Sequence, residues 1–359
     1  MNPVYIIAEA GVNHNGDKKM AFQLIDVAVK AGADAVKFQT FKAENIVTKS
    51  AVKAEYQKQA TDEFETQFKM LKRLELSYEL HHELIKYCQE KKIEFLSTAF
   101  DMESLDFLVN QLELKILKIS SGEITNGPLL LAHAKTGCDL ILSTGMSTLG
   151  EIEDALGVIA FGLLNNDRHQ PSKINFQKAY FSTEGQKLLK EKVTILHCTT
   201  EYPVPPQEVN LNVILTFRST FGLKTGYSDH SEGIAVPIAA TSIGATLIEK
   251  HFTLDKELPG PDHRASLDPD ELCAMIRAIR TIEQAMGSSI KIPCPSELKN
   301  RLISRKSLIA AKDIRKGEQF TEENIIIKRP GTGISPMEYW DMIKEVAQSN
   351  FVKDTAIEK

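Results

Sequence analysis

Short apolar runs rich in β-branched residues alternate along the chain with longer stretches in which apolar residues recur every three or four positions. The short runs are typical of buried strands, and the longer stretches are typical of amphipathic helices. Helical patterns occur, for example, at 20–33, 78–92 and 149–161. We predict eight strands, at Tyr5–Ala10, Ala35–Gln39, Glu94–Thr98, Ile116–Ser120, Leu140–Thr144, Thr194–Cys198, Thr225–Ser228 and Thr246–Lys250.

Eight strands that alternate with helices are the set required for a (β/α)8 barrel, which usually takes about 250 residues. The alternative is a doubly wound open sheet. Its GxGxxG fingerprint is absent, because the first predicted strand is followed by GVNHNG. We therefore predict an α/β fold, a (β/α)8 TIM barrel over 1–286. One connection, at 163–192, is unusually long, and we expect it to be a surface excursion.

The composition changes after the predicted barrel. Residues 287–300 read GSSIKIPCPSELKN, and their glycine, serines and two prolines predict a linker. The final segment, 301–359, has short apolar runs and glycine turns, so we predict a small β-rich domain. A unit of this size buries little apolar surface alone, and we expect it to dock onto another surface.

The overall composition excludes several classes of protein. The chain has 359 residues, 42% hydrophobic residues and a formal net charge of −5, which argues against general binding to nucleic acid or to an anionic membrane. No apolar run approaches the roughly 18 residues of a membrane span, and the start MNPVYIIAEAG lacks a signal-peptide pattern. Five scattered cysteines without a CxxC pair predict reduced thiols and a cytoplasmic location.

Polar residues gather at the carboxyl ends of the predicted strands, whose interiors are apolar. The carboxyl ends of all eight strands of a barrel meet at one mouth, where barrel enzymes carry their active sites. We therefore predict an active site at this mouth. Its candidate residues include Glu9, Lys37, Gln39, Thr98, Lys118, Ser121, Ser143, Tyr202, Ser228, His230, Glu249 and His251.

Two lysines, Lys37 and Lys118, lie within the apolar runs AVKFQ and ILKIS. A buried lysine is unfavourable unless an anion pairs with it. Together with the nearby hydroxyls, the two lysines favour a small ligand with two anionic groups, such as a phosphorylated carboxylic acid. The alternative is a lysine that forms a Schiff base with a carbonyl substrate, which requires a lowered lysine pKa.

Two histidines, His230 and His251, end strands that are neighbours in a barrel, so their imidazoles can share one cation. With water and a carboxylate such as Glu9 or Asp229, they would suit Mn²⁺, Mg²⁺, Fe²⁺ or Zn²⁺. The alternative is that each histidine is only hydrogen-bonded at its strand end. Their spacing along the chain is no local ligand signature, so both interpretations stay open at this point.

Ten short motifs occur in a fixed order and cover essentially the whole chain. Together they closely resemble the sialic-acid (nonulosonate) synthase family, which includes N-acetylneuraminate and N,N'-diacetyllegionaminate synthases. The resemblance identifies 301–359 as the antifreeze-like (SAF) domain of that family. The motifs are IAEAGVNHNG (7–16), VKFQTF (36–41), LSTAFD (96–101), KISSGE (118–123), LSTGM (142–146), HCTTEYP (197–203), GYSDH (226–230), EKHFTLD (249–255), PGPDH (259–263) and KRPGTGIS (328–335).

The resemblance implies condensation of phosphoenolpyruvate with the open-chain aldehyde of an N-acetylated mannosamine-type sugar, with release of phosphate. It implies His230 and His251 as ligands of a divalent metal ion, Mn²⁺ or Mg²⁺. The implied phosphoenolpyruvate ligands are Lys37, Thr98, Lys118, Ser121, Ser143 and Ser228. The implied sugar-binding and acid/base residues are Glu9, Gln39, Tyr202, Glu249 and Asp262.

The resemblance also implies a domain-swapped homodimer, in which Arg329 reaches from the SAF domain of one subunit into the barrel mouth of its partner. One position departs from the family pattern, because some members have asparagine where this chain has Thr200. A threonine hydroxyl can still donate a hydrogen bond, but its side chain is shorter than that of asparagine.

For the acceptor, we expect N-acetylmannosamine, giving N-acetylneuraminate. The alternative is 2,4-diacetamido-2,4,6-trideoxymannose, giving N,N'-diacetyllegionaminate. An enzyme that condenses phosphoenolpyruvate with a phosphorylated aldose would need further basic residues for the second phosphate, and the strand ends show no additional arginine. A non-catalytic carbohydrate-binding protein is an alternative from another class, which the presence of both lysines and both histidines argues against.

Overall fold

The structure is a computed structural model that describes residues 3–61, 64–165 and 169–358. The chain divides between Gly287 and Ser288 into two compact units. Each unit is considered by itself. Among the described residues, no helix combines the length and the apolar character that crossing a membrane demands. All five cysteines are free.

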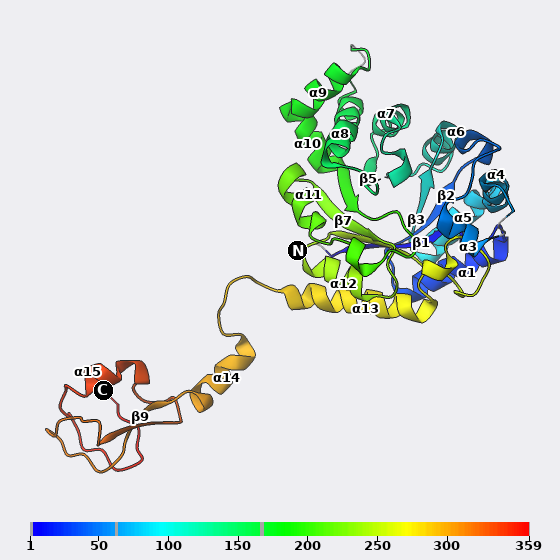
Figure 1. The fold of residues 1–359 in the computed structure, drawn as a ribbon. Coiled ribbons are helices and arrows are strands. Elements are labelled where there is room, and N and C mark those ends of the chain that lie inside the picture. The colour runs from blue at the N-terminus through cyan, green and yellow to red at the C-terminus, as the bar shows by residue number, and fades with distance from the viewer. Residues whose placement is uncertain (1–2, 62–63, 166–168, 359) are drawn as a thin grey trace. The chain divides into compact units, whose positions relative to one another are not determined.

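The first unit is a closed barrel of eight parallel strands that pair in chain order (Figure 1). The predicted TIM-barrel fold is confirmed, and every predicted strand lies within one residue of an observed one at each end. The strands are β1 (Tyr5–Gly11), β2 (Ala35–Thr40), β3 (Glu94–Ala99), β4 (Ile116–Ile119), β5 (Asp139–Ser143), β6 (Val193–His197), β7 (Lys224–Asp229) and β8 (Leu247–His251).

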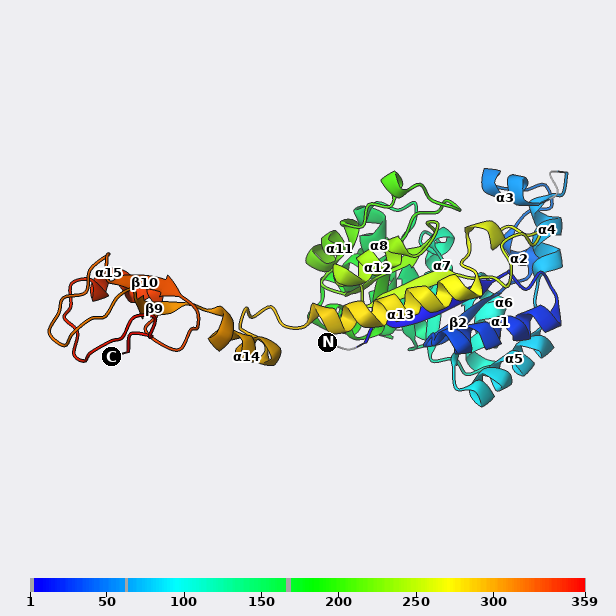
Figure 2. The same ribbon diagram turned by 90° about the horizontal axis from the view of Figure 1, so that it is seen from below.

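Helices surround the barrel, and α13 packs against α1 and α12 to close the ring (Figure 2). The helices of this unit are α1 (Lys18–Ala31), α2 (Ala43–Ile46), α3 (Glu55–Ala60), α4 (Gln67–Leu74), α5 (Tyr78–Lys91), α6 (Met102–Asp106), α7 (Gly127–Lys135), α8 (Leu149–Leu163), α9 (Lys173–Phe181), α10 (Thr183–Lys192), α11 (Val213–Phe221), α12 (Ala235–Ser242) and α13 (Pro269–Met286).

Local signals in the sequence determine where these helices begin and end. Asp17 precedes α1 and its side chain accepts a hydrogen bond from the Met20 amide, while Gly32 ends the helix in the left-handed conformation at φ 83°. Helix α13 begins with a capping box, in which the Asp268 side chain accepts from the Glu271 amide and the Glu271 side chain accepts from the Asp268 amide.

The strands are apolar along nearly their whole length because both of their faces are buried. The outward faces pack beneath the helices in one large core that includes Ile6, Ala8 and Val36. The inward faces form a second apolar cluster in the barrel interior. Its buried members are Ile7, Ala35, Leu96, Ile141, Leu196 and Leu247.

Two connections carry additional helices. The β2–β3 connection contains α2, α3 and α4 before α5. The long connection predicted as a surface excursion contains α9 and α10, both packed against α8. Part of that excursion, 166–168, lies outside the described residues.

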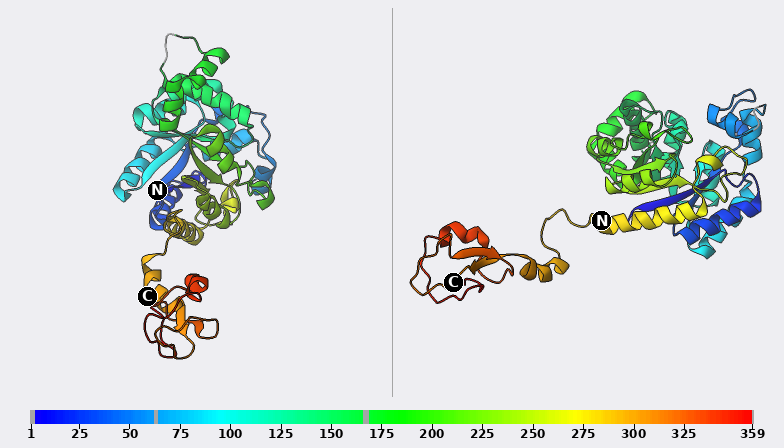
Figure 3. Two further views of the ribbon diagram at one scale, coloured as in Figure 1. Left: turned by 90° about the vertical axis from the view of Figure 1, so that its left-hand side faces the viewer. Right: turned by 60° about the horizontal axis from the view of Figure 1, so that its bottom comes forward.

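The second unit contains a small antiparallel sheet of β9 (Ser307–Ala310) and β10 (Ile325–Lys328) among turns and loops (Figure 3), together with α14 (Pro295–Ser304) and α15 (Tyr339–Met342). Helix α14 begins inside the segment predicted as a linker. A proline at the first position of a helix favours its start, and the Glu297 side chain accepts from the Cys294 amide, so the proline read as a linker signal instead begins a helix. The apolar core of this unit consists of Leu308, Ala310, Ile314, Phe320, Ile325, Ile334, Ala347 and Ile357.

Candidate active site

The inward-facing side chains change from apolar to polar between one inward position and the next along several of the strands. Alternate residues of a strand share one face, so the residue two positions beyond an inward apolar residue also points inward. Ile7 is thus followed by Glu9, Leu96 by Thr98, Ile141 by Ser143 and Leu247 by Glu249, and all four polar side chains are buried. The strand-end prediction is explained by this change from an apolar layer to a polar one.

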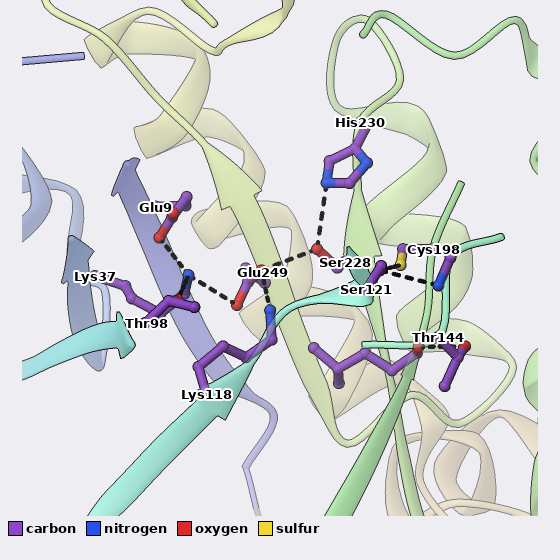
Figure 4. A network of polar contacts seen from close by, with 12 residues as sticks. Glu9, Lys37, Thr98, Lys118, Ser121, Thr144, Cys198, Ser228, His230 and Glu249 are labelled. Atoms are coloured by element: carbon purple, nitrogen blue, oxygen red, sulfur yellow. Dashed lines mark hydrogen bonds and ion pairs between the residues drawn. The ribbon is translucent and has the colours of Figure 1, made fainter. Parts of the chain in front are cut away.

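Two lysines and two glutamates form a buried network in the polar layer (Figure 4). The Lys37 ammonium lies 2.7 Å from Glu9 Oε2 and 3.6 Å from Glu249 Oε2, and it donates to Thr98 Oγ1 at 3.1 Å. The Lys118 ammonium donates to Glu249 Oε1 at 2.8 Å. Each of the four charged side chains is at most 5% exposed. The lysines therefore meet the anionic partners that their burial requires.

The network moves the pKa values of its members in different directions. Burial lowers the pKa of Lys37, but attraction to Glu249 and Glu9 outweighs burial and leaves this pKa above its usual value. Burial raises the pKa of Glu249, but Lys118 and Lys37 hold it below the usual range. Glu9 has a raised pKa because burial and the charge of Glu249 exceed the effect of Lys37. A raised pKa makes Lys37 unsuited to Schiff-base chemistry.

Hydroxyl groups line the same mouth. Ser228 donates to Glu249 Oε1 at 2.9 Å, and Ser121 Oγ accepts from the Gly145 amide at 3.0 Å. The hydroxyls of Ser143 and Thr200 are buried and have no hydrogen-bond partner among the described residues. Buried hydroxyls normally have a partner, so these two are available to a bound ligand.

The two candidate metal ligands, His230 and His251, lie close together, with ring centroids 5.7 Å apart. His230 Nδ1 donates to the Thr199 carbonyl at 2.6 Å, so Nε2 is the ring nitrogen that carries a lone pair, and it lies 3.5 Å from Ser228 Oγ. His251 Nδ1 is buried without a hydrogen-bond partner among the described residues and lies 3.8 Å from Asp262 Oδ2.

Burial lowers the pKa of His230 to about 4 and holds the pKa of His251 well below its usual value, so both imidazoles are neutral. Neutral imidazole is the form that binds a metal ion. Within the described ranges, no three potential ligand side chains group closely enough to hold an ion by themselves. The pair therefore fits a cation that also takes ligands from water or substrate.

The predicted sugar-side residues surround the histidines from the loops. The Tyr202 ring stacks on His230 at 4.1 Å between centroids and meets His251 edge-on at 5.7 Å. Asp262 is buried, and burial raises its pKa to about 6. Gln39 is half-buried on β2, one strand position after Phe38.

Arg329 lies in the second unit, directly after β10. Its side chain is exposed, and Nε donates to the Ser304 carbonyl at 3.0 Å. The role of Arg329 in a partner subunit stays a prediction.

Comparison with known proteins gives the family. The model of the NeuB family matches residues 24–291, and the model of the SAF domain matches 305–359. The chain belongs to the NeuB family. It is 48% identical over 357 residues to the N,N'-diacetyllegionaminic acid synthase of Campylobacter jejuni subsp. jejuni, covering 99% of both chains.

Two further NeuB family relatives extend this comparison. The N,N'-diacetyllegionaminic acid synthase of Legionella pneumophila subsp. pneumophila is 44% identical, over 98% of this chain and 93% of that protein. The crystal structure of the N-acetylneuraminic acid synthetase of Leptospira borgpetersenii is 33% identical, with a TM-score of 0.66 over 83% of this chain and 90% of the other. The predicted family and the predicted SAF domain are confirmed.

The structure corrects one assignment and adds one residue to the site of this NeuB family member. Asp229, one of the carboxylates considered for the cation, instead pairs with Lys250 at 2.6 Å. Strand alternation explains the difference, because Asp229 follows the inward Ser228 and therefore points outward. From α3, Tyr56 packs against Tyr202 with centroids 5.0 Å apart. No local pattern in the sequence links Tyr56 to Tyr202, which lies well over a hundred residues later in the loop after β6.

Proposed function

We propose that this protein condenses phosphoenolpyruvate with the open-chain aldehyde of an N-acetylated mannosamine-type sugar and releases phosphate. The observation that carries this proposal is the buried pair of lysines at the barrel mouth, each held beside a carboxylate. Two ammonium groups that share a dry site, with hydroxyls around them, suit the phosphate and carboxylate of phosphoenolpyruvate. Membership of the NeuB family supports the same reaction class.

In this proposal, Lys37 and Lys118 bind the two anionic groups of phosphoenolpyruvate and hold its enol carbon toward the acceptor. The unpartnered hydroxyl of Ser143 supplies a further hydrogen bond. The remaining hydroxyl ligands are Thr98, Ser121 and Ser228. This arrangement accelerates the reaction mainly by proximity and orientation.

The two carboxylates have different tasks. When C3 of phosphoenolpyruvate attacks the aldehyde, positive charge develops at C2, and the ionised Glu249 stabilises it electrostatically. Glu9, with its raised pKa, accepts a proton from the water that adds at C2. The tetrahedral adduct then loses phosphate, which leaves the ketone of the product.

His230 and His251 would hold the divalent metal ion, Mn²⁺ or Mg²⁺, through their neutral imidazoles. Such an ion, when bound, supplies Lewis-acid polarisation of the sugar aldehyde. Tyr202, stacked on His230, orients that ring and covers it from the loop side. Gln39 and Asp262 would contact hydroxyl or acetamido groups of the sugar.

For the acceptor, we propose 2,4-diacetamido-2,4,6-trideoxymannose, giving N,N'-diacetyllegionaminate. The two relatives at 48% and 44% identity both carry the name of that activity, whereas the N-acetylneuraminic acid synthetase is 33% identical. These identities favour the alternative over the N-acetylmannosamine acceptor that the sequence motifs alone led us to expect.

We further propose a homodimer in the cytoplasm, in which Arg329 of one subunit contacts the acetamido group of the sugar in its partner. The exposure of the Arg329 side chain and the five free cysteines support these two parts of the proposal.

A phosphate-release assay with phosphoenolpyruvate and each sugar tests the function. We expect kcat/KM for 2,4-diacetamido-2,4,6-trideoxymannose to exceed that for N-acetylmannosamine by at least tenfold, and mass spectrometry to detect the nine-carbon product. The reverse preference would overturn the acceptor assignment. Sugar binding without release of phosphate from phosphoenolpyruvate in the presence of either sugar would favour a carbohydrate-binding protein.

A further inference from the structure

A second buried ion pair lies behind the metal-binding histidines, on the outward face of the same two strands. Lys250 Nζ lies 2.6 Å from Asp229 Oδ2, and neither side chain is exposed to solvent. The two residues are register partners across β7 and β8, next to the inward pair of Ser228 and Glu249. The pair therefore joins β7 and β8 at their carboxyl ends, directly before the two histidines.

The hydrogen bonds of this pair involve the residues on either side of His230. Asp229 Oδ1 accepts from the Ser231 amide at 2.9 Å and from the Ser231 hydroxyl at 2.7 Å, and it also accepts from the Tyr227 hydroxyl at 3.1 Å. Lys250 Nζ donates to the Ser231 carbonyl in addition to Asp229. One ammonium group thus contacts the residues on both sides of His230.

The same lysine directly precedes the other histidine, His251. Because β7 ends at Asp229, His230 has no register partner on β8. Lys250 is therefore the side chain that ties the backbone around His230 to the backbone that carries His251. The Thr199 carbonyl fixes the His230 ring, but no hydrogen bond to a described residue fixes Nδ1 of His251.

A contribution to folding stability does not by itself explain why the charges of Asp229 and Lys250 are buried. Removal of two charges from water opposes folding, and replacing a buried ion pair by apolar residues is often neutral or stabilising. The charges of Asp229 and Lys250 also cancel, so the pair adds little net field at the mouth.

We infer that Lys250 and Asp229 are positioning residues, which set the spacing and orientation of His230 and His251 for a shared cation. This inference rests on the metal-binding part of the proposed function. Residues that orient metal ligands typically change metal affinity by 10–100-fold when they are altered.

The test uses the full-length double variant Asp229→Asn/Lys250→Met, which removes both charges together and leaves no unpaired buried charge. The control is Asp34→Asn/Arg280→Met, whose ion pair is partly exposed. It breaks another ion pair, with Nη2–Oδ2 at 2.7 Å, between α13 and the residue that precedes β2 at the other end of the barrel. Mn²⁺ affinity of the metal-free proteins is measured by titration calorimetry, with the melting temperature measured in parallel.

We expect Asp229→Asn/Lys250→Met to bind Mn²⁺ at least tenfold more weakly than the wild-type chain, with the control within twofold of wild type. Mn²⁺ affinity within twofold of wild type in Asp229→Asn/Lys250→Met would overturn the inference and leave the proposed function intact. An equal loss of affinity in the control would also overturn it, because the effect would then follow stability. No Mn²⁺ binding by the wild-type chain would overturn the metal part of the proposed function and this inference with it.

Discussion

Glu9 and Glu249 show how neighbouring groups can give two identical side chains different chemistry. Glu249 lies beside two ammonium groups and has a lowered pKa, whereas Glu9 lies beside one and has a raised pKa. The sequence predicts that both residues are at the mouth, because strand alternation places them there. It does not predict which lysine pairs with which glutamate, because Lys118 and Glu249 are more than a hundred residues apart and meet only when the barrel closes.

Lys37 is the residue whose loss should affect the site most directly. In Lys37→Met, Glu9 and Glu249 face each other without the ammonium between them, and an anionic ligand loses a counter-charge. We expect kcat/KM for phosphoenolpyruvate to fall by about 10³-fold, measured by phosphate release. Lys18→Met removes an exposed ion pair with Glu83 and should leave kcat/KM unchanged. A similar fall in both variants would contradict the assignment.

Gly145 provides a steric test of the hydroxyl cluster. A Cβ at this position would meet Thr200 Oγ1 and would lie 2.9 Å from Ser121 Oγ, so Gly145→Ala must displace one of the hydroxyls. We expect the KM for phosphoenolpyruvate to rise about tenfold or more in steady-state kinetics. Gly127→Ala is the control, because a Cβ there has no heavy atom within 4 Å. An unchanged KM in Gly145→Ala would place the phosphoenolpyruvate site elsewhere.

At the scale of elements, the sequence predicts the barrel strands to within one residue and predicts α5, but it does not predict α2, α3 and α4 of the β2–β3 connection. The strands are buried on both faces, so they appear as continuous apolar runs. Helices α2 and α3 are short and only partly buried, and α3 reaches the site through the packing of Tyr56 against Tyr202. A contact of this kind leaves no periodic pattern in the sequence.

Changes in helix α3 should therefore affect binding of the sugar more than binding of phosphoenolpyruvate. In Tyr56→Ala, Tyr202 loses the ring that packs behind it and holds it against His230. We expect a rise of about 5- to 20-fold in the KM for the sugar, consistent with the loss of an aromatic pair, with the KM for phosphoenolpyruvate within twofold. Tyr87→Ala, on the outer helix α5, is the control. Equal changes in both KM values would show that α3 acts on the whole mouth.

At the scale of the molecule, the histidines divide unequally between the two units. All nine lie before Gly287. Several are buried and neutral. Burial lowers the pKa of His133 to about 4, even though its Nδ1 donates to the Leu129 carbonyl, and burial lowers the pKa of His81 to about 4 as well. The barrel should therefore be the acid-sensitive part of the chain.

The sign of the effect follows from proton binding. Between pH 6.5 and 4 the unfolded chain protonates these histidines and the folded barrel does not, so stability falls as the pH falls through this range. At pH 5 each such histidine lowers the free energy of unfolding by about 2 kcal/mol relative to neutral pH. We expect His133→Leu to reduce the loss of melting temperature between pH 7 and pH 5. His82→Leu, at an exposed position, should leave this loss of melting temperature unchanged. An equal loss in His133→Leu and in the wild-type chain would contradict the explanation.

A layer of apolar side chains fills the barrel interior beneath the polar residues of the active site. Most of the proposed phosphoenolpyruvate ligands lie on the strands directly above this layer, whereas Tyr202 and Asp262 come from loops beyond the strand ends. A sugar held by the loops would cover a molecule held by the strands. This geometry predicts an order of binding. Phosphoenolpyruvate should bind to the free enzyme in calorimetry, and a sugar that binds first should block the entry of phosphoenolpyruvate.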